Sequence, residues 1–405
     1  MGIHSRPILI FLGIWLVFPC IGNGQEYTLS IKAGARHIAR PIIQFDLPEP
    51  AQPIYQATSA SNPREPLFVQ KLLSGKYLMV LPDTLLANTQ RIFQLTPVYG
   101  SMSSSKVQTA RSGNTIVVSI EEKPFFNYRG DPGLPHPDSP AHYTGSGFIH
   151  PLYSPGGKIL TDGFPAGHAH QNGIFSAWTR AIYKGDTVDF WNRQQLRGKV
   201  EHLRVDTVLQ GLVATQVQTT GRFVSLKHGD ILHETRTVTV YPFGDAFVLD
   251  MELVQKNITT DTLFIPQYHY GGFALRGSRT WNPDDVQHFS QHWNLLTSTG
   301  IQGPAANDTH AEWVSIWGDT GEGVAGVAVF SHPDNFRHPQ AIRVHPSMPY
   351  WCFCPCIDGP FFIAPDQPFI ARYRYFSFDG VPDMVLIRTL SQAYDRNSQI
   401  TVSLQ

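Results

Sequence analysis

The stretch HETRTVTVYP, residues 233–242, places threonine at positions 235, 237 and 239, with valine between them at 238 and 240. Successive side chains of a β-strand point to opposite faces of a sheet, so this period of two is typical of an antiparallel strand with one wet face. Comparable runs flank it, namely KVEHLRVDTVLQ (199–210), LVATQVQTTGRFVS (212–225) and FVLDMELVQK (247–256). Together these runs predict a large antiparallel sheet.

The composition agrees with an all-β fold. The 405-residue chain is 42% hydrophobic and 12% aromatic, and its 34 glycines and 31 prolines follow no period, which indicates many short strands joined by turns. Only MVLIRTLSQAYDR (384–396) has clear helical spacing. We therefore expect a small N-terminal β-sandwich-like region followed by a large antiparallel β-sandwich.

Four segments are expected along the chain. Residues 1–24 resemble a cleaved secretory signal, because Arg6 precedes a short apolar run that ends in small residues. Residues 25–122 form the N-terminal β domain in this interpretation, residues 123–146 a Pro/Gly-rich connection, and residues 147–405 the sandwich that carries the site. The expected location is periplasmic or secreted, without a lipid anchor, since the residues before Cys20 lack the usual lipoprotein pattern.

Charge and hydropathy narrow the class of partner. Lys and Arg number 31 against 32 Asp and Glu, with no basic block, so nucleic acid is not an expected partner. No stretch approaches the roughly 18 apolar residues that a membrane span needs. A small molecule or an oligosaccharide is the expected partner, and the oligomeric state is not predicted.

Candidate chemistry begins in the segment from Gly147 to Trp178, which holds GHAHQNG at 167–173. On an extended backbone His168 and His170 would project to the same side. Imidazoles titrate near neutrality, so we take His168, His170 and His269 as candidate catalytic groups, with Asp189 to orient one of them or act as a base. A shared metal, a sugar-binding cleft and simple loop capping all remain open for the two neighbouring histidines. The candidates for further metal ligands are Asp189, His269, His332, His338 and His345.

The remaining polar and aromatic residues favour carbohydrate. Sugars present hydroxyls to amides, carboxylates and arginine, and C–H faces to aromatic rings. We expect about two of six tryptophans to face a ligand: Trp178, Trp191, Trp281, Trp313, Trp317 and Trp351. The candidate substrate-binding residues are Arg276, Trp191, Asn335, Arg337 and His338. Glu234 is expected to face water.

Three cysteines, Cys352, Cys354 and Cys356, occur in WCFCPC. They are either buried apolar side chains or a soft-metal or redox cluster. We favour burial, because no Cys-x-x-Cys spacing is present. The sequence also lacks a nucleophile elbow, a phosphate loop and a dinucleotide fingerprint.

An ordered series of motifs resembles a known family. SGFIHPLYSPGGKILTDGFP (146–165), GIFSAW (173–178), DFWN (189–192), YHYGGFALRG (268–277) and HPDNFRHP (332–339) are similar to the secreted bacterial "methane oxygenase PmoA-like" family, a domain of unknown function. The resemblance runs from Phe148 to the C-terminus. Where members carry Asp-His-Pro-His-His-(Arg or His)-Gly, this chain has Gly167 and Gln171 in place of the acidic residue and the third histidine. The string LYSPGGK with long strands is also similar to the galactose-mutarotase-like supersandwich, which hosts sugar epimerases, hydrolases and lyases.

These features lead to three hypotheses. The first is a carbohydrate-active enzyme, a glycoside hydrolase, lyase or sugar epimerase, that acts on a glycoside or modified sugar in polysaccharide breakdown by histidine or carboxylate acid–base catalysis without a cofactor. The second is a non-catalytic glycan-binding protein. The third, which the family name implies, is an oxygenase or hydrolase that depends on a divalent metal.

Overall fold

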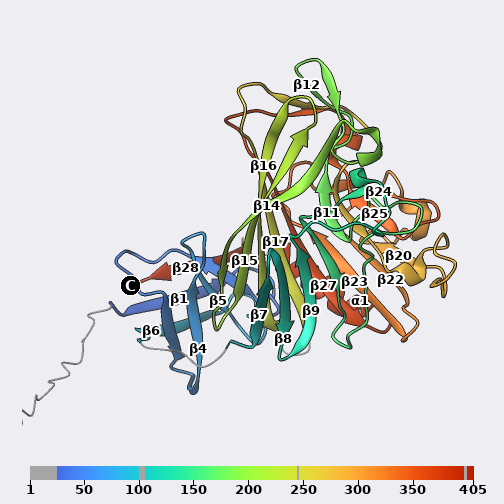
Figure 1. Cartoon of the computed structure of the whole chain (residues 1–405). Helices are drawn as coiled ribbons and strands as arrows, with labels where there is room; N and C mark the ends of the chain where they lie inside the picture. The colour runs from blue at the N-terminus through green and yellow to red at the C-terminus, as the bar shows by residue number, and fades with distance from the viewer. Residues whose placement is uncertain (1–24, 100–104, 244–245, 396–398) are drawn as a thin grey trace, which may run out of the picture.

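The computed structural model describes residues 25–99, 105–243, 246–395 and 399–405 (Figure 1). The predicted signal sequence, residues 1–24, lies outside the described residues. The fold is all-β, as predicted, and every strand pair among the described residues is antiparallel. The segment with helical spacing forms α1 (Met384–Asp395).

The eight-stranded sheet contains the long alternating runs. Its strands in spatial order are β14 (Gly198–Leu209), β15 (Thr215–Ser225), β16 (Gly229–Phe243), β17 (Ala246–Asn257), β27 (Phe369–Asp379), β23 (Val324–Ser331), β22 (Trp313–Asp319) and β20 (Asn294–Thr297). In β16, Val238 and Val240 are buried in the central core, whereas Thr235 and Thr237 on the other face are only half-buried. The period of two therefore decides which face of the sheet is covered.

A nine-stranded sheet packs against this core face. Its order is β21 (His310–Ala311), β24 (Gln340–Val344), β25 (Tyr350–Phe353), β19 (Gly272–Arg276), β11 (Ile174–Ala177), β10 (Phe148–Leu152), β9 (Lys123–Arg129), β8 (Thr115–Ile120) and β7 (Val107–Ser112). Val238 of β16, Ile174 of β11 and Ile342 of β24 belong to one buried cluster. The two sheets thus form the predicted large sandwich.

A seven-stranded sheet holds the N-terminal region, drawn in blue in Figure 1. Its order is β2 (Ile42–Phe45), β5 (Tyr77–Val80), β4 (Asn62–Lys71), β3 (Ile54–Ser59), β6 (Gln90–Pro97), β1 (Tyr27–Ala33) and β28 (Ile400–Leu404). The last strand of the chain pairs with the first, Leu404 opposite Leu29 and Val402 opposite Ile31. The C-terminal strand therefore completes the N-terminal sheet, although we expected residues 147–405 to form the sandwich domain.

The expected boundary at residue 122 falls inside the nine-stranded sheet. β8, which we placed in the N-terminal region together with β7, pairs with β7 on one side and with β9 on the other. β9 opens the segment that was expected to be irregular. The high proline and glycine content of residues 130–146 led us to expect no regular element from residue 123 onward, although the aromatic-rich residues 123–129 form β9. The irregular chain that follows β9 contains one 3₁₀ helix, η1 (Ala141–Tyr143).

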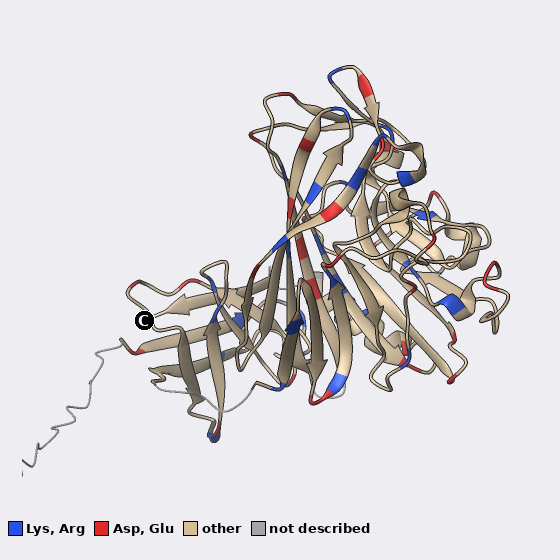
Figure 2. Ribbon diagram, viewed as in Figure 1, with Lys and Arg blue, Asp and Glu red and all other residues tan. Residues whose placement is uncertain are grey.

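The remaining elements are short. A four-stranded sheet, near the label β12 at the top of Figure 1, has the order β13 (Asp186–Val188), β12 (Ala181–Tyr183), β18 (Leu263–Ile265) and β26 (Phe361–Ile363). Further 3₁₀ helices are η2 (Arg193–Gln195), η3 (Arg279–Trp281), η4 (Gly303–Ala306) and η5 (Pro355–Asp358). None of the helices in the described ranges has the length and apolarity needed to span a bilayer. Blue and red segments are interspersed along the ribbon in Figure 2.

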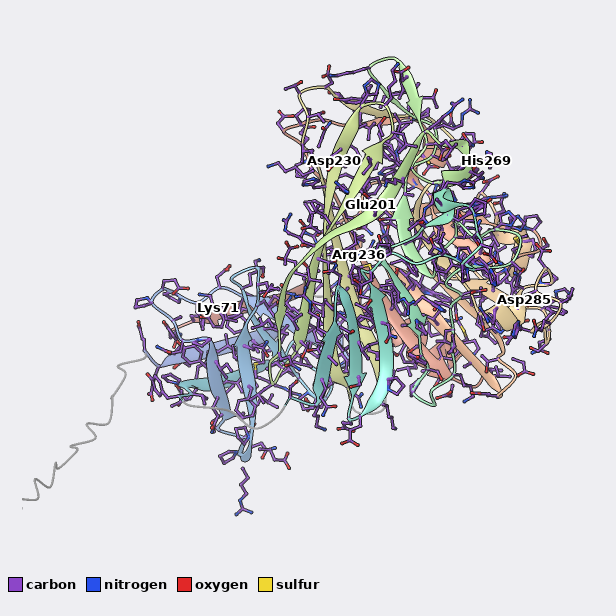
Figure 3. All side chains as sticks on the ribbon, viewed as in Figure 1. Lys71, Glu201, Asp230, Arg236, His269 and Asp285 are labelled. Carbon is purple, nitrogen blue, oxygen red and sulfur yellow. The ribbon has the colours of Figure 1, made fainter. Side chains whose placement is uncertain are left out.

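A buried ion pair connects the two sheets of the sandwich. Glu234 and Arg236 of β16 are 2% and 4% exposed, which corrects the expectation that Glu234 faces water. Arg236 donates to Glu234 at 2.8 Å and to the Gly147 carbonyl at 2.8 Å, and Ser176 of β11 donates to Glu234 at 2.5 Å. Strict alternation places both charged residues on the same face as Val238, inside the core. Figure 3 labels Arg236 near the centre of the molecule.

Candidate active site

One cavity gathers all three predicted catalytic histidines. It has a volume of about 230 Å³. Its lining residues are His168, His170, Gln171, Trp191, Asn192, Gln194, His269, Tyr270, Arg343, His345 and Tyr350. This set contains four imidazoles, three aromatic side chains, three amides and one guanidinium, and no carboxylate.

The nine-stranded sheet positions this lining. β24, β25, β19 and β11 are neighbours in the sheet, and most lining residues lie in these strands or in loops beside them. Trp191, Asn192 and Gln194 come from the segment between β13 and β14. Arg343 lies in β24, His345 follows that strand, and Tyr350 begins β25. His269 precedes β19 and is labelled at the upper right of Figure 3. Adjacent antiparallel strands thus bring residues from distant parts of the chain to one place.

The His168–His170 segment is a turn, not the extended chain that we expected. His168 N–H donates to the Pro165 carbonyl at 3.2 Å, and Gln171 N–H donates to the His168 carbonyl at 2.9 Å. The two imidazoles nevertheless both line the cavity, with ring centroids 5.6 Å apart. His345 adds a third ring, 5.8 Å from that of His168.

Gly167 shows why this turn disfavours a side chain at its start. Its φ of 78° lies in the left-handed region, which glycine adopts readily. A Cβ at this position would lie 2.4 Å from a carboxylate oxygen of Asp284. In this chain the Asp284 carboxylate therefore occupies the space next to the turn.

The cavity holds its imidazoles neutral. Burial lowers the pKa of His170 from 6.5 to about 4, with further lowering by His168 and Arg193. Burial also lowers the pKa of His345 to about 4, aided by His168 and Arg343. The pKa values of His168 and His269 are lowered as well, again mainly by burial. At neutral pH these rings are uncharged donors and acceptors.

The hydrogen bonds of His345 decide which of its nitrogens is the donor. The backbone N–H groups of Ser347 and Met348 donate to His345 Nδ1 at 3.3 and 3.1 Å. Because Nδ1 is an acceptor, the neutral ring carries its hydrogen on Nε2. His170 differs: among the described residues, none hydrogen-bonds its ring nitrogens. The cavity therefore contains one imidazole assigned as a donor and one that is free to accept a proton.

Asp189 lies beneath the cavity rather than in it. Its side chain has 0% exposure, and its carboxylate accepts from Thr179 Oγ1, from the backbone N–H groups of Trp191 and Asn192, and from Asn192 Nδ2, at 2.7 to 3.0 Å. Asn192 Nδ2 also donates to the Tyr270 hydroxyl at 2.9 Å. The carboxylate thus positions Trp191 and Asn192 for the lining, and it lacks the access that a catalytic base requires.

Arg276 lies behind the lining. It is fully buried, and its Nη1 donates to Gln171 Oε1 at 3.1 Å. Its Nε and Nη2 have no hydrogen-bond partner among the described residues, and neither does the buried Nδ1 of His168. Burial lowers the pKa of Arg276 to about 10, so the side chain stays positive at neutral pH. Arg276 therefore does not line the cavity itself but orients Gln171, which does.

The turn that contains Asn335, Arg337 and His338 does not reach the cavity. Asn335 Nδ2 donates to Ser331 Oγ at 3.0 Å, and its Oδ1 accepts from the backbone of Arg372 at 2.8 Å. Arg337 donates to the carbonyls of residues 355, 359 and 360. The Nδ1 atom of His338 lies 3.4 Å from Ser331 Oγ. Asn335 and Arg337 therefore hold neighbouring backbone in place. The sequence motif alone did not predict this structural role.

Of the six candidate tryptophans, Trp191 is the one that lines the cavity. Its ring packs edge-on against Tyr270 and Tyr350, with centroid distances of 5.6 and 5.8 Å. Trp178 and Trp281 are fully buried and donate their Nε1–H groups to Gln255 and to the Asp319 carbonyl. Core packing accounts for these two rings.

The three cysteines are buried in β25 or just after it. Tyr350 donates to Cys352 Sγ at 3.1 Å, and the sulfurs of Cys354 and Cys356 lie 3.3 Å apart. Burial is what we favoured for these thiols. Within the described residues no group of three or more His, Cys, Asp or Glu side chains is arranged to hold a metal ion. The metal-dependent hypothesis stays a prediction.

Sequence reasoning missed much of the lining, namely Gln171 as a ligand-facing residue, Asn192, Gln194, Tyr270, Arg343 and Tyr350. Asn192 lies in the DFWN motif and Tyr270 in the YHYGG motif, next to the predicted site residues Trp191 and His269. Their closeness in sequence to those residues could have indicated that they line the site. Arg343 stood two residues before His345, which we had considered only as a metal ligand. Nothing in the local pattern distinguished it from a surface arginine.

The fold and the cavity together define an antiparallel β-sandwich protein with an imidazole-lined pocket at neighbouring strands of one sheet. The chain belongs to a family of unknown function, DUF6807, whose pattern matches residues 115–392 and so includes the whole cavity lining. No curated protein matches the chain.

Three solved structures of glycoside hydrolases have a low level of similarity to this chain. A protein in the glycosyl hydrolase family 38 from Enterococcus faecalis has 9% identity and a TM-score of 0.40 over 94% of this chain and 47% of that chain. An α-mannosidase from Enterococcus faecalis has 8% identity and a TM-score of 0.42 over 94% and 46%. A GH36 α-galactosidase from Geobacillus stearothermophilus has 11% identity and a TM-score of 0.32 over 68% and 40%. The chain spans less than half the length of these proteins, and likenesses at this level assign no activity.

Proposed function

We propose that this protein is a carbohydrate-active enzyme that binds a sugar unit in the imidazole-lined cavity and transforms it by imidazole acid–base chemistry. The observation that carries the proposal is the convergence of four imidazoles with Trp191, two tyrosines and three amides in one cavity.

The lining suits a polyhydroxylated ligand. Trp191, Tyr270 and Tyr350 offer aromatic surface to the C–H face of a sugar ring, while Gln171, Asn192 and Gln194 can donate to and accept from hydroxyls. The volume of about 230 Å³ lies below the roughly 300–1,000 Å³ typical of drug-sized ligand sites. The cavity therefore fits about one sugar ring rather than a long oligosaccharide.

Two imidazoles supply complementary proton-transfer groups. His345 presents Nε2–H as a donor, because Nδ1 is occupied by backbone N–H groups. His170 is neutral and has no hydrogen-bond partner among the described residues, so it can accept a proton from a bound ligand. General acid–base groups of this kind contribute about 10²–10⁴-fold to a rate.

The test compares His170→Gln and His345→Gln with His136→Gln, a control in which a surface histidine, 71% exposed, is changed outside the cavity. Each variant is incubated with neutral and acidic oligosaccharides, with binding followed by calorimetry and products by chromatography. We expect turnover to fall by about 10²–10⁴-fold in the two cavity variants and to be unchanged in the control.

The outcomes separate the hypotheses. Binding without any product, with affinity lost in the cavity variants, would show a glycan-binding protein instead of an enzyme. Absence of saccharide binding by the unmodified protein would refute the proposal.

A further inference from the structure

We propose that the sugar bound in this cavity is a 4-linked uronate, that Arg343 binds its carboxylate, and that the glycosidic bond is broken by β-elimination rather than by hydrolysis. This inference rests on the proposed carbohydrate function and adds the charge of the substrate and the class of reaction.

The charge of the lining points to an anion. Arg343 is the one guanidinium in the lining, and Asp and Glu are absent from that set. Arg343 Nη1 donates to the neutral side-chain oxygen of Asn307 at 2.8 Å, and no ion pair joins Arg343 to an acidic side chain of the described residues. Fully buried Arg276 adds a second positive charge behind Gln171, which Asp162 and Asp284 partly offset. A carboxylate on the ligand would supply the missing negative charge through charge-assisted hydrogen bonds.

The same lining lacks what glycoside hydrolysis uses. Most glycosidases place two carboxyl groups on either side of the scissile bond, one as acid and one as base or nucleophile. Two acidic residues lie next to the cavity without lining it: Asp284 beside the His168 turn, and Asp189, whose two oxygens are already engaged by hydroxyl, amide and backbone donors. Proton abstraction next to a carboxylate instead requires a neutral base, a proton donor and a cation, which are all present.

The elimination step balances with the groups present. His170 takes the proton from C5 of the uronate, the carbon that bears the carboxylate, and the electron pair of that C–H bond forms a C4=C5 double bond. The C4–O bond breaks, and its electron pair goes to the glycosidic oxygen, which receives the Nε2 proton of His345. Arg343 stabilises the negative charge that develops on the carboxylate during abstraction. The step leaves His170 as an imidazolium and His345 as an imidazolate, and proton exchange through solvent returns both rings to the neutral state, so no water, oxidant or reductant is consumed.

The experiment uses polygalacturonate, alginate and heparosan, three 4-linked uronate polymers, each beside its carboxyl-reduced neutral form. We expect at least one uronate polymer to yield product with the ultraviolet absorbance of an unsaturated uronate, and its neutral form to yield none. Arg343→Gln should weaken binding of the acidic polymer roughly tenfold or more. Arg64→Gln, which removes an exposed arginine of the N-terminal sheet, should leave binding unchanged.

Failure of this inference is distinct from failure of the proposed function. If neutral saccharides are bound and cleaved as well as acidic ones, or if all products are saturated, the uronate assignment falls and the carbohydrate function stands. If Arg343→Gln weakens the binding of acidic and neutral saccharides equally, Arg343 does not bind the carboxylate and the inference is overturned. Loss of unsaturated product in His170→Gln with retained polymer binding would support the assigned base. Binding of neither class refutes both proposals.

Discussion

At the scale of residues, the chemistry of the cavity depends on desolvated imidazoles. His170 and His345 are neutral because burial and nearby positive groups oppose their protonation. Asp189, which we had considered as a base, instead uses its carboxylate to hold the turn that presents Trp191. Hydrogen bonding thus separates Asp189, which supports the lining, from the imidazoles that line the cavity.

These imidazoles should make stability depend on pH in a defined window. The folded-state pKa values of His170 and His345 are about 4, against an ordinary value of 6.5. Between these values the unfolded chain binds protons that the folded chain does not, so the free energy of unfolding falls as pH drops from 6.5 towards 4 and is fully retained above 6.5. The groups that act on these rings are His168, Arg193, Arg276 and Arg343, which lower the pKa values, and Asp189 and Asp284, which raise them.

The measurement is urea unfolding at several pH values between 4 and 7. In His170→Gln the loss of stability across this window should be smaller than in the unmodified protein, because one proton-uptake site is removed from the unfolded state. His136→Gln should keep the full pH dependence. An unchanged slope in His170→Gln would contradict a lowered pKa at this ring.

At the scale of elements, β16 links the eight-stranded sheet to β10 and β11 of the nine-stranded sheet. Its outward threonines and inward valines set the register, and the Glu234–Arg236 pair on the inward face contacts Gly147 and Ser176. Gln255 of β17 joins the same network by donating to Glu234 at 2.8 Å. One buried charge pair thus fixes how the eight-stranded sheet meets β10 and β11.

Glu234→Gln should destabilise the protein by about 3–5 kcal/mol, because it leaves the buried Arg236 without its counter-charge. Chemical denaturation measures this loss. Thr235→Ala, a change on the outward face of the same strand, should cost about 1 kcal/mol or less. If the two variants lose equal stability, the charge pair does not hold the sheets together. Replacing both charged residues by apolar ones should cost less than Glu234→Gln alone.

At the scale of the whole molecule, the two ends of the described chain share one sheet. β28 is an edge strand beside β1, and Gln405 and Thr28 exchange backbone hydrogen bonds at 3.0 and 2.9 Å. Ile400, Val402 and Leu404 pack against the core of the N-terminal sheet. Folding of that region therefore requires residues from both ends of the described chain.

Val402→Lys should lower the free energy of unfolding by about 1–2 kcal/mol, since it removes a half-buried apolar side chain from that core. Thr401→Lys, whose side chain is exposed on the opposite face, is the matched control and should have little effect. Thermal unfolding of the two variants checks the prediction. Equal melting temperatures would show that β28 contributes nothing to the N-terminal core.

The amount that the sequence predicted differs between the fold and the site. Alternation in β16 and helical spacing at 384–396 predicted element types directly, because a local pattern decides which face is buried. His168, His170, His269 and Trp191 were identified as site residues from motif chemistry, and the structure brings all four to one cavity. Arg343 and Tyr350 escaped notice because their positions in the cavity depend on strand order, which no local pattern encodes. Asn335, Arg337 and His338 were misplaced for the same reason.

The sequence by itself determined an all-β chain with a period of two and a set of imidazoles able to transfer protons near neutrality. The tertiary structure alone decided that β24, β25, β19 and β11 are neighbours, that β28 returns to β1, and that Glu234 is paired inside the core. The physical reason is that side-chain alternation is set by adjacent residues, whereas the surroundings of an ionisable group are set by contacts between residues far apart in the chain. Those contacts determine burial, burial determines the protonation of the imidazoles, and protonation determines the chemistry that the cavity can perform.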